Sequence, residues 1–269
     1  NHTLVELRAS RSGEKIPAVV QLADPQQDLA LLSPSRPDGF PTLVPLPIGT
    51  DMPTNDGLAF LQFDNTARLR SSQARLIEVS MNNLPNAPYS GLTATLLASE
   101  NVNGVGAPVL YGGRLAGLIL AFNSDDRTAM MVPGVVLSRF LEDAARQPYL
   151  GPASAGLFWS PLIDPAKRRY LGVADEVGGI LLSSFVPRVM ADQVLKPEDV
   201  LIEMDGQAID RLGFYQDASL GRLNFSHLIR GHHRPGDVIP LKVVRHGKVV
   251  EVALTLGTWD DRKSFIPDN

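Results

Sequence analysis

The sequence contains no cysteine among its 269 residues, which excludes disulfides, thiolate metal ligands and a cysteine nucleophile. It also lacks an excess of basic residues. The formal net charge is -4, so no cationic surface for nucleic acid is expected. No apolar run approaches the ~18 residues that a membrane-spanning helix requires, and the longest candidate, LAGLILAF (115–122), is typical of a buried strand. We therefore expect neither nucleic-acid binding nor a transmembrane segment.

Histidine is scarce, and four of the five histidines lie in the second half of the chain. They are His2, His227, His232, His233 and His246. His232 and His233 are adjacent, and adjacent side chains diverge on a helix or a strand. The glycine-rich segment GGRLAG lacks the strand-to-helix context of a phosphate-binding loop. The sequence therefore predicts neither a bound metal nor a cofactor.

Short apolar runs separated by turn residues occupy positions 1–132. Examples are IPAVVQL, LVPLPIG (43–49) and RLAGLILAF, with intervening turns such as SGEK, RPDGF and NSDD. Short strands at even spacing indicate a β-barrel or a β-sandwich. A helix is expected over 133–147, where a proline precedes apolar residues at helical spacing.

The length suits two domains of roughly 100–150 residues each. We assign the chain as follows: a first domain with its terminal helix at 1–147, a linker rich in proline and glycine at 148–154, a second domain at 155–258, and a tail at 259–269. The second domain mixes strands with helices predicted over 189–195 and 221–231. YLGVAD (170–175) is expected to be a strand, and HGK (246–248) a hairpin turn.

Four segments of the second domain resemble the PDZ domain of HtrA/Deg proteins. They are RRYLGV (168–173), GGILLSSFVP (178–187), LKPEDVLIEMDGQAI (195–209) and GDVIPLKVVRHGKVVEVALTL (236–256). Segment 209–237 is longer than a minimal PDZ domain needs, and it resembles the plant-type and fungal branch of the family. The resemblance implies an α+β fold that binds an extended peptide or a protein C-terminus by adding a strand to a sheet edge.

This resemblance implies a peptide site formed by a loop and a helix. The loop candidates are Arg169, Tyr170, Leu171, Gly172 and Val173. A glycine without Cβ lets the backbone approach a ligand closely. Phe225 and Ile229, at i and i+4, share one face of the predicted helix. The alternative is that the apolar residues of this set belong to the core and that the basic pair 168–169 is solvated surface.

Three segments of the first domain resemble the trypsin-like barrel of HtrA/Deg proteins. They are DPQQDLALLSP (24–34), NGVGAPVLYGGRLAGLILAF (103–122) and MMVPGVVLSRFLED (130–143). The resemblance implies a mainly β fold, a chymotrypsin-like double β-barrel, with Asp28 at the position of the triad aspartate. Val105 stands where the family pattern G-N-S-G-G-P has its serine, and valine has no nucleophilic atom.

The rest of the catalytic machinery is also altered. Asn103, Gly104 and Val105 form the remnant of the oxyanion loop, and Asn103 and Ala107 replace the first and last glycine of the pattern. Ser99 lies too far upstream to restore the register. His2 sits directly on the first strand, so the position of the triad histidine is expected to lie before residue 1. We therefore expect an N-terminally incomplete first barrel, completed by an upstream segment or by a partner chain.

Three functions remain open. The sequence favours a proteolytically inactive HtrA/Deg homologue that binds peptides or protein C-termini through its PDZ domain. It would act as a scaffold or regulator in protein quality control, as a homo-oligomer that is a trimer or larger. The alternatives are an active HtrA-type serine endopeptidase, with nucleophile and histidine outside this register, and an adaptor with a closed PDZ groove. Family analogy favours the periplasm or another extracytoplasmic compartment.

Overall fold

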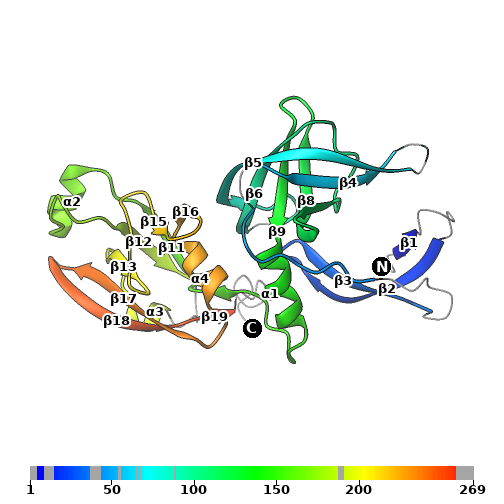
Figure 1. Cartoon of the computed structure of the whole chain (residues 1–269). Helices are drawn as coiled ribbons and strands as arrows, with labels where there is room; N and C mark the ends of the chain where they lie inside the picture. Colours follow the sequence, from blue (N-terminus) through cyan, green and yellow to red (C-terminus); the bar gives the residue numbers. More distant parts are fainter. Residues whose placement is uncertain are drawn as a thin grey trace. The chain divides into compact units, whose positions relative to one another are not determined.

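The computed structural model of the chain describes residues 5–8, 15–36, 44–53, 56–64, 66, 68–87, 89–186 and 191–258. The chain divides into two compact units, Asn1–Tyr149 and Leu150–Asn269 (Figure 1). His2 and the expected tail at 259–269 lie outside the described residues. Among the helices of the described part, none is long and apolar enough to cross a membrane.

The first unit begins with an antiparallel sheet of three strands. These are β1 (Val5–Arg8), β2 (Lys15–Asp24) and β3 (Leu29–Pro34), in the order β1-β2-β3, coloured blue in Figure 1. In the described residues this sheet does not close into a barrel, and Val19, Val20 and Leu32 are 37–48% exposed. The idea that an upstream segment or a partner chain completes it stays a prediction.

Six further strands of the first unit form a closed barrel. They are β4 (Leu58–Phe63), β5 (Leu69–Asn83), β6 (Ser90–Ala98), β7 (Pro108–Tyr111), β8 (Arg114–Asn123) and β9 (Thr128–Pro133). Their order is β4-β5-β6-β9-β8-β7, and the pairing of Phe60 with Val109 joins the last strand to the first. Alternate side chains fill the barrel because a strand has a side-chain period of two. The large apolar side chains among them that are no more than 1% exposed are Leu58, Phe60, Leu96, Val109, Ile119 and Met131.

The strand expected over 43–49 is wrong. Of its described part, 44–49, only Ile48 pairs, as an isolated bridge to Leu115. Pro45 and Pro47 have no N–H group to donate to a strand ladder, which explains why this apolar stretch does not join the barrel.

Helix α1 (Gly134–Ala144) follows β9 directly. This confirms the helix expected over 133–147, apart from its last turn. Pro133 is the N-cap, and Leu137 and Phe140 lie on the buried face.

The chain after α1 is tied back to the turn between β2 and β3. Tyr149 packs edge-on against Phe140, with ring centroids 6.2 Å apart, and its hydroxyl donates to the carboxylate of Asp24. Asp24 is only 3% exposed and also accepts the side-chain amide of Gln27 at 2.8 Å. Burial, helped by the Asp24 contact, raises the pKa of Tyr149 above its ordinary value. The phenol therefore keeps its proton and the tie persists at neutral pH.

The second unit is built on a six-stranded sheet. Its strands are β11 (Leu157–Pro161), β12 (Ile180–Phe185), β13 (Val200–Met204), β14 (Gln207–Ala208), β17 (Val238–Arg245) and β18 (Lys248–Thr255). The order is β11-β12-β13-β17-β18, with β14 paired to β13. Two smaller pairs are β10 (Ala153–Ser154) with β19 (Gly257–Thr258), and β15 (Phe214–Asp217) with β16 (Gly221–Asn224). The helices are α2 (Pro165–Leu171), α3 (Ala191–Val194) and α4 (Ser226–His232).

Two elements of the second unit differ from the sequence-based expectation. The strand expected over 170–175 is wrong, because 165–171 is helix α2. Asp164 caps this helix through the N–H of Ala166 at 2.8 Å, and Pro165 takes the first position, an arrangement that favours helix initiation. The helix expected over 221–231 is preceded by strand β16 and begins only at Ser226. The hairpin turn at 246–248 is confirmed, with left-handed backbone at His246 and Gly247.

The core of the second unit contains a fully buried arginine. Arg168 of α2 is 0% exposed. Its guanidinium donates to three backbone carbonyls, those of Leu162 at 3.3 Å, Ala174 at 2.7 Å and Val177 at 2.5 Å. Arg168 therefore belongs to the core and does not offer a charge to a ligand.

Candidate functional site

The loop that resembles a protease nucleophile loop connects β6 to β7. Val105 lies at its tip, in a turn, and is 73% exposed. Gly106 follows with a φ of 84°, a left-handed conformation that favours glycine. The N–H of Gly106 donates to the carbonyl of Ile119 in β8 at 2.7 Å, so the barrel holds the base of the turn. The position predicted for the nucleophile is thus exposed and carries an isopropyl group, which has no nucleophilic atom.

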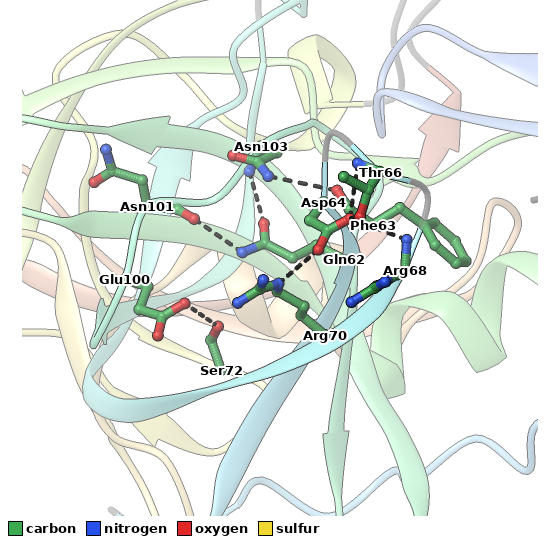
Figure 2. Close-up of polar contacts among 10 residues, drawn as sticks. All are labelled: Gln62, Phe63, Asp64, Thr66, Arg68, Arg70, Ser72, Glu100, Asn101 and Asn103. Carbon is green, nitrogen blue, oxygen red and sulfur yellow. Dashed lines mark hydrogen bonds and ion pairs between the residues drawn. The ribbon is translucent and has the colours of Figure 1, made fainter.

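A glutamine side chain from β4 forms hydrogen bonds with the residues that precede this turn (Figure 2). Oε1 of Gln62 accepts the backbone N–H of Asn103 at 2.8 Å, and its Nε2 donates to the carbonyl of Asn101 at 3.0 Å. The side-chain amide of Asn103 donates to the carbonyl of Phe63 at 3.5 Å. Both ends of the Gln62 amide therefore bind backbone groups of the loop.

This contact bears directly on the remnant of the oxyanion loop. A trypsin-like protease stabilises its oxyanion with the N–H of the nucleophile residue and the N–H two positions earlier. In the register predicted from the sequence, these positions are Val105 and Asn103. Since the Asn103 N–H already donates to Gln62, a substrate oxygen would have to displace that hydrogen bond. Sequence reasoning missed Gln62, because it lies 41 residues from Asn103 and no local pattern links the two.

The turn between β4 and β5 is stiffened beside Gln62. Asp64 accepts the hydroxyl of Thr66 at 2.6 Å, the N–H of Arg68 at 3.0 Å and Nε of Arg70 at 2.8 Å (Figure 2). These hydrogen bonds, the one from Thr66 above all, hold the pKa of Asp64 well below its ordinary value. Asp64 is therefore a permanent anion that fixes this turn, not a proton donor.

Asp28, the expected triad aspartate, lies between β2 and β3 with a left-handed φ of 55°. Its Oδ2 accepts the side-chain amide of Asn86 at 3.0 Å. The described residues of the first unit include no histidine. Within that part of the chain, Asp28 therefore has an amide beside it and no imidazole to orient, which is the role of a triad aspartate.

The expected peptide-binding loop lies at the end of α2. Residues 169–171 belong to the helix, and Gly172 is its C-cap with a φ of 71°. A Cβ on Gly172 would come within 2.6 Å of Cα of Gly247, so the helix end packs against the β17–β18 turn. Leu171 and Val173 are 8% and 4% exposed and belong to the core. The glycine serves a helix end and a close packing contact.

A polar surface pocket of about 460 Å³ lies beside the same helix end. Tyr170, 74% exposed, and Arg245 are among its lining residues. Arg245 donates to both carboxylate oxygens of Asp199, at 2.8 and 2.6 Å, and Asp199 is 1% exposed. Lys167 pairs with Glu198 at 2.7 Å. The charges of Arg245 and Lys167 are used within the fold, whereas Lys196, another lining residue, is exposed.

The other expected site residues contact a different strand. Phe225 and Ile229 are 2% and 5% exposed. The ring of Phe225 packs edge-on against Trp159 of β11, with centroids 5.3 Å apart. Strand β11 is at the end of the sheet order, so in the described part of the chain one of its edges has no strand partner. Gly156, with a φ of 60°, lies just before it.

The tertiary structure therefore does not bring the expected loop and helix to one site. It places 169–173 at the end of α2, and it brings Phe225 to β11 instead. Trp159 and Gly156 were missed by the sequence reasoning. The sequence signal for these two residues was the glycine ahead of the aromatic pair in AGLFWS (155–160). The segment YLGV was chosen instead, because it also combines a glycine with apolar residues.

No protein-family model matches the chain. Among curated proteins, it is 26% identical over 258 residues to the relative named protease Do-like 3, mitochondrial, of Arabidopsis thaliana, covering 93% of this chain and 45% of that protein. It is 26% identical over 254 residues to a protein named as a DegP-like periplasmic serine endoprotease of Chlamydia pneumoniae, covering 91% and 48%. The chain spans about half the length of the curated relatives it matches.

Solved structures agree in fold. The HtrA-type protease AlgW with a decapeptide superimposes with a TM-score of 0.68 at 20% identity, covering 93% of this chain and 74% of that one. A serine endoprotease from Yersinia pestis superimposes with a TM-score of 0.58 at 15% identity, covering 93% and 78%. The mainly β, trypsin-like fold expected from the sequence is confirmed. Together with the curated relatives, these matches show that the chain is similar to HtrA/Deg proteases.

Proposed function

We propose that this chain is a proteolytically inactive HtrA/Deg homologue that binds peptides or protein C-termini through its second unit. The proposal rests above all on the nucleophile loop. Val105 occupies the serine position, and the Asn103 N–H needed for an oxyanion hole is bound to Gln62. Without a nucleophilic oxygen no acyl-enzyme forms, and with one oxyanion donor engaged the tetrahedral intermediate loses stabilisation worth about 3 kcal/mol.

The test is covalent labelling by a fluorophosphonate probe, with an active HtrA protease as the positive control. The natural chain is expected to remain unlabelled. The Val105→Ser variant is also expected to remain unlabelled, because a serine alone has no base beside it in the described residues and one oxyanion donor remains bound to Gln62. Labelling of the natural chain would establish the alternative, an active serine endopeptidase, and mapping the modified serine would locate its nucleophile.

Peptide binding is proposed at the open edge of β11. A PDZ-type site adds the ligand as a further strand and receives its terminal carboxylate in the loop before the edge strand. Gly156, with its left-handed backbone, belongs to that loop, and the Trp159–Phe225 contact brings the segment before α4 to the strand. The AlgW structures named as solved with a decapeptide and with a tripeptide support the proposal by analogy.

Trp159 offers a local probe of this site. In a Trp259→Phe background, a peptide with a free C-terminus is expected to change the Trp159 emission in a saturable way. The same peptide with an amidated C-terminus is expected to bind at least about ten-fold more weakly, because it lacks the negative charge that strengthens hydrogen bonds from backbone N–H groups. Tyr170→Ala is the matched control. This variant is expected to bind the peptide with unchanged affinity. A loss of peptide affinity would show that the peptide binds at the end of α2 and not at β11. No response to any peptide would favour an adaptor with a closed groove.

The remaining roles are proposed on family grounds. They are a scaffold or regulator in protein quality control, a homo-oligomer that is a trimer or larger, and a periplasmic or other extracytoplasmic location. The exposed apolar side chains of the β1-β2-β3 sheet are compatible with a partner on that sheet. Sedimentation equilibrium would test the oligomer, and a single monomeric species up to about 100 μM protein, above the common range of specific affinities, would contradict it.

A further inference from the structure

Three side chains with metal-ligating atoms meet at α4, although they are apart in the sequence. Asp217 ends β15, His227 lies in the first turn of α4, and His232 is its last residue. One ligand atom of each lies within 4.8 Å of those of the other two. In the sequence, the adjacent pair 232–233 did not indicate a metal site. The histidine that lies near His232 is His227, five residues earlier in α4.

Tyr215 determines which ring nitrogen of His227 carries a proton. Its hydroxyl is 3.1 Å from Oδ2 of Asp217 and 2.5 Å from Nδ1 of His227. Asp217 also accepts the backbone N–H groups of Ser219 and Leu220, each at 2.9 Å. Tyr215 has a single proton to donate, whereas a carboxylate has none.

Only one tautomer of His227 satisfies both of these hydrogen bonds. The Tyr215 proton must go to the Asp217 carboxylate, which has none, so Nδ1 of His227 must donate to the phenol oxygen. The lone pair of the imidazole then lies on Nε2. Metal-ligating histidines are held in this way, with the other ring nitrogen donating to a fixed acceptor.

The backbone of α4 makes room beside that nitrogen. A Cβ on Gly231 would lie 2.7 Å from Nε2 of His227. A glycine inside a helix costs roughly 1 kcal/mol relative to alanine, and here its bare Cα lets the ring lie along the helix toward His232. The two imidazole rings are edge to face, with centroids 4.9 Å apart.

We propose that Asp217, His227 and His232 bind a divalent transition-metal ion of the Zn²⁺ class. Two imidazoles and one carboxylate are a typical ligand set for Zn²⁺, with a fourth position for water or a ligand group. Bonds of about 2.0–2.2 Å place tetrahedral ligand atoms roughly 3.4 Å apart, so the separations of up to 4.8 Å must shorten by as much as about 1.4 Å. His232 is exposed, and rotation of its side chain supplies that movement. The ion would link the β15–β16 hairpin to both ends of α4.

The experiment uses the full chain, freed of any affinity tag and treated with a chelator. Zn²⁺ is expected to raise the thermal midpoint of the second unit in a saturable way, and Co²⁺ to give the visible absorption of a tetrahedral complex. His232→Ala removes an exposed ligand and should fold, yet abolish both responses. Tyr215→Phe keeps the ring but not the hydroxyl, and affinity about 10–100-fold weaker is expected from loss of such an orienting partner.

His246→Asn is the matched control. His246 is exposed at a hairpin turn and has a left-handed backbone conformation, which asparagine also adopts. It should respond to Zn²⁺ and Co²⁺ as the natural chain does. Equal responses in the natural chain and in His232→Ala would overturn the proposal, because the metal would then bind elsewhere. Absence of any Zn²⁺ response in the natural chain would overturn it as well. Neither result depends on protease activity or on peptide binding.

Discussion

Arg168→Met is expected to lower the free energy of unfolding of the second unit by about 3 kcal/mol or more, since each buried acceptor left without a donor costs 1–3 kcal/mol. Arg168 is fully buried and serves the carbonyls of Leu162, Ala174 and Val177. Methionine fills much of the volume but donates no hydrogen bond. No carboxylate is hydrogen-bonded to this guanidinium among the contacts described, so the variant removes donors without freeing a paired anion.

Urea unfolding followed by tryptophan fluorescence measures this loss. Both tryptophans of the chain, Trp159 and Trp259, belong to the second unit, so their emission reports that unit. Arg169→Met is the control, because the next residue of the same helix is exposed, and a change within about 0.5 kcal/mol is expected for such a surface substitution. Equal unfolding midpoints for the two variants would show that Arg168 is not the core residue that its contacts indicate.

Gly117→Ala is expected to destabilise the barrel of the first unit by about 3 kcal/mol, at the upper end of the usual cost of overpacking a core. A Cβ at this position of β8 would lie 2.3 Å from the carbonyl oxygen of Val132 and 2.6 Å from Cγ of Met131. The Met131 side chain can move, but the Val132 carbonyl belongs to β9, which is hydrogen-bonded to β8. Relief therefore requires the two strands to separate.

Calorimetry of the full chain, compared with thermal unfolding followed by tryptophan fluorescence, tests this prediction. The transition of the first unit is expected to move to lower temperature, while the transition of the second unit, which the tryptophans report, stays in place. Gly104→Ala is the matched control. A Cβ at Gly104 meets no atom within 4 Å, so this substitution in the nucleophile loop should leave both transitions unchanged. If Gly117→Ala also left them unchanged, the close packing of β8 on β9 would be refuted.

The fold could be predicted from the sequence wherever the signal was local. Alternating apolar residues located the barrel strands, and Pro133 with the apolar spacing after it located α1. Prediction failed where a local pattern had two meanings. YLGV joins apolar residues to a glycine, which suits a strand with a binding loop but equally suits the last turn and C-cap of a helix. The capping pair Asp164–Pro165 was the signal that favoured the helix.

The candidate site shows the same division. The sequence alone showed that residue 105 offers no nucleophile, because a valine side chain has no reactive atom whatever its surroundings. The hydrogen bond from the Asn103 N–H to Gln62 could not be predicted from the sequence, since Gln62 lies on a strand 41 residues away. Likewise, the edge strand at Trp159 became a candidate only when β11 was found at the end of the sheet order.

By itself the sequence determined chemistry that needs no geometry. It excluded cysteine chemistry, put a valine at the position predicted for the nucleophile and carried the segments that resemble HtrA/Deg proteins. Only the tertiary structure decided which polar groups meet, as with Asn103 and Gln62, the buried Arg168, and the group of Asp217, His227 and His232. Periodicity and turn signals act over a few residues, whereas these contacts join positions that chain folding alone brings within hydrogen-bond distance.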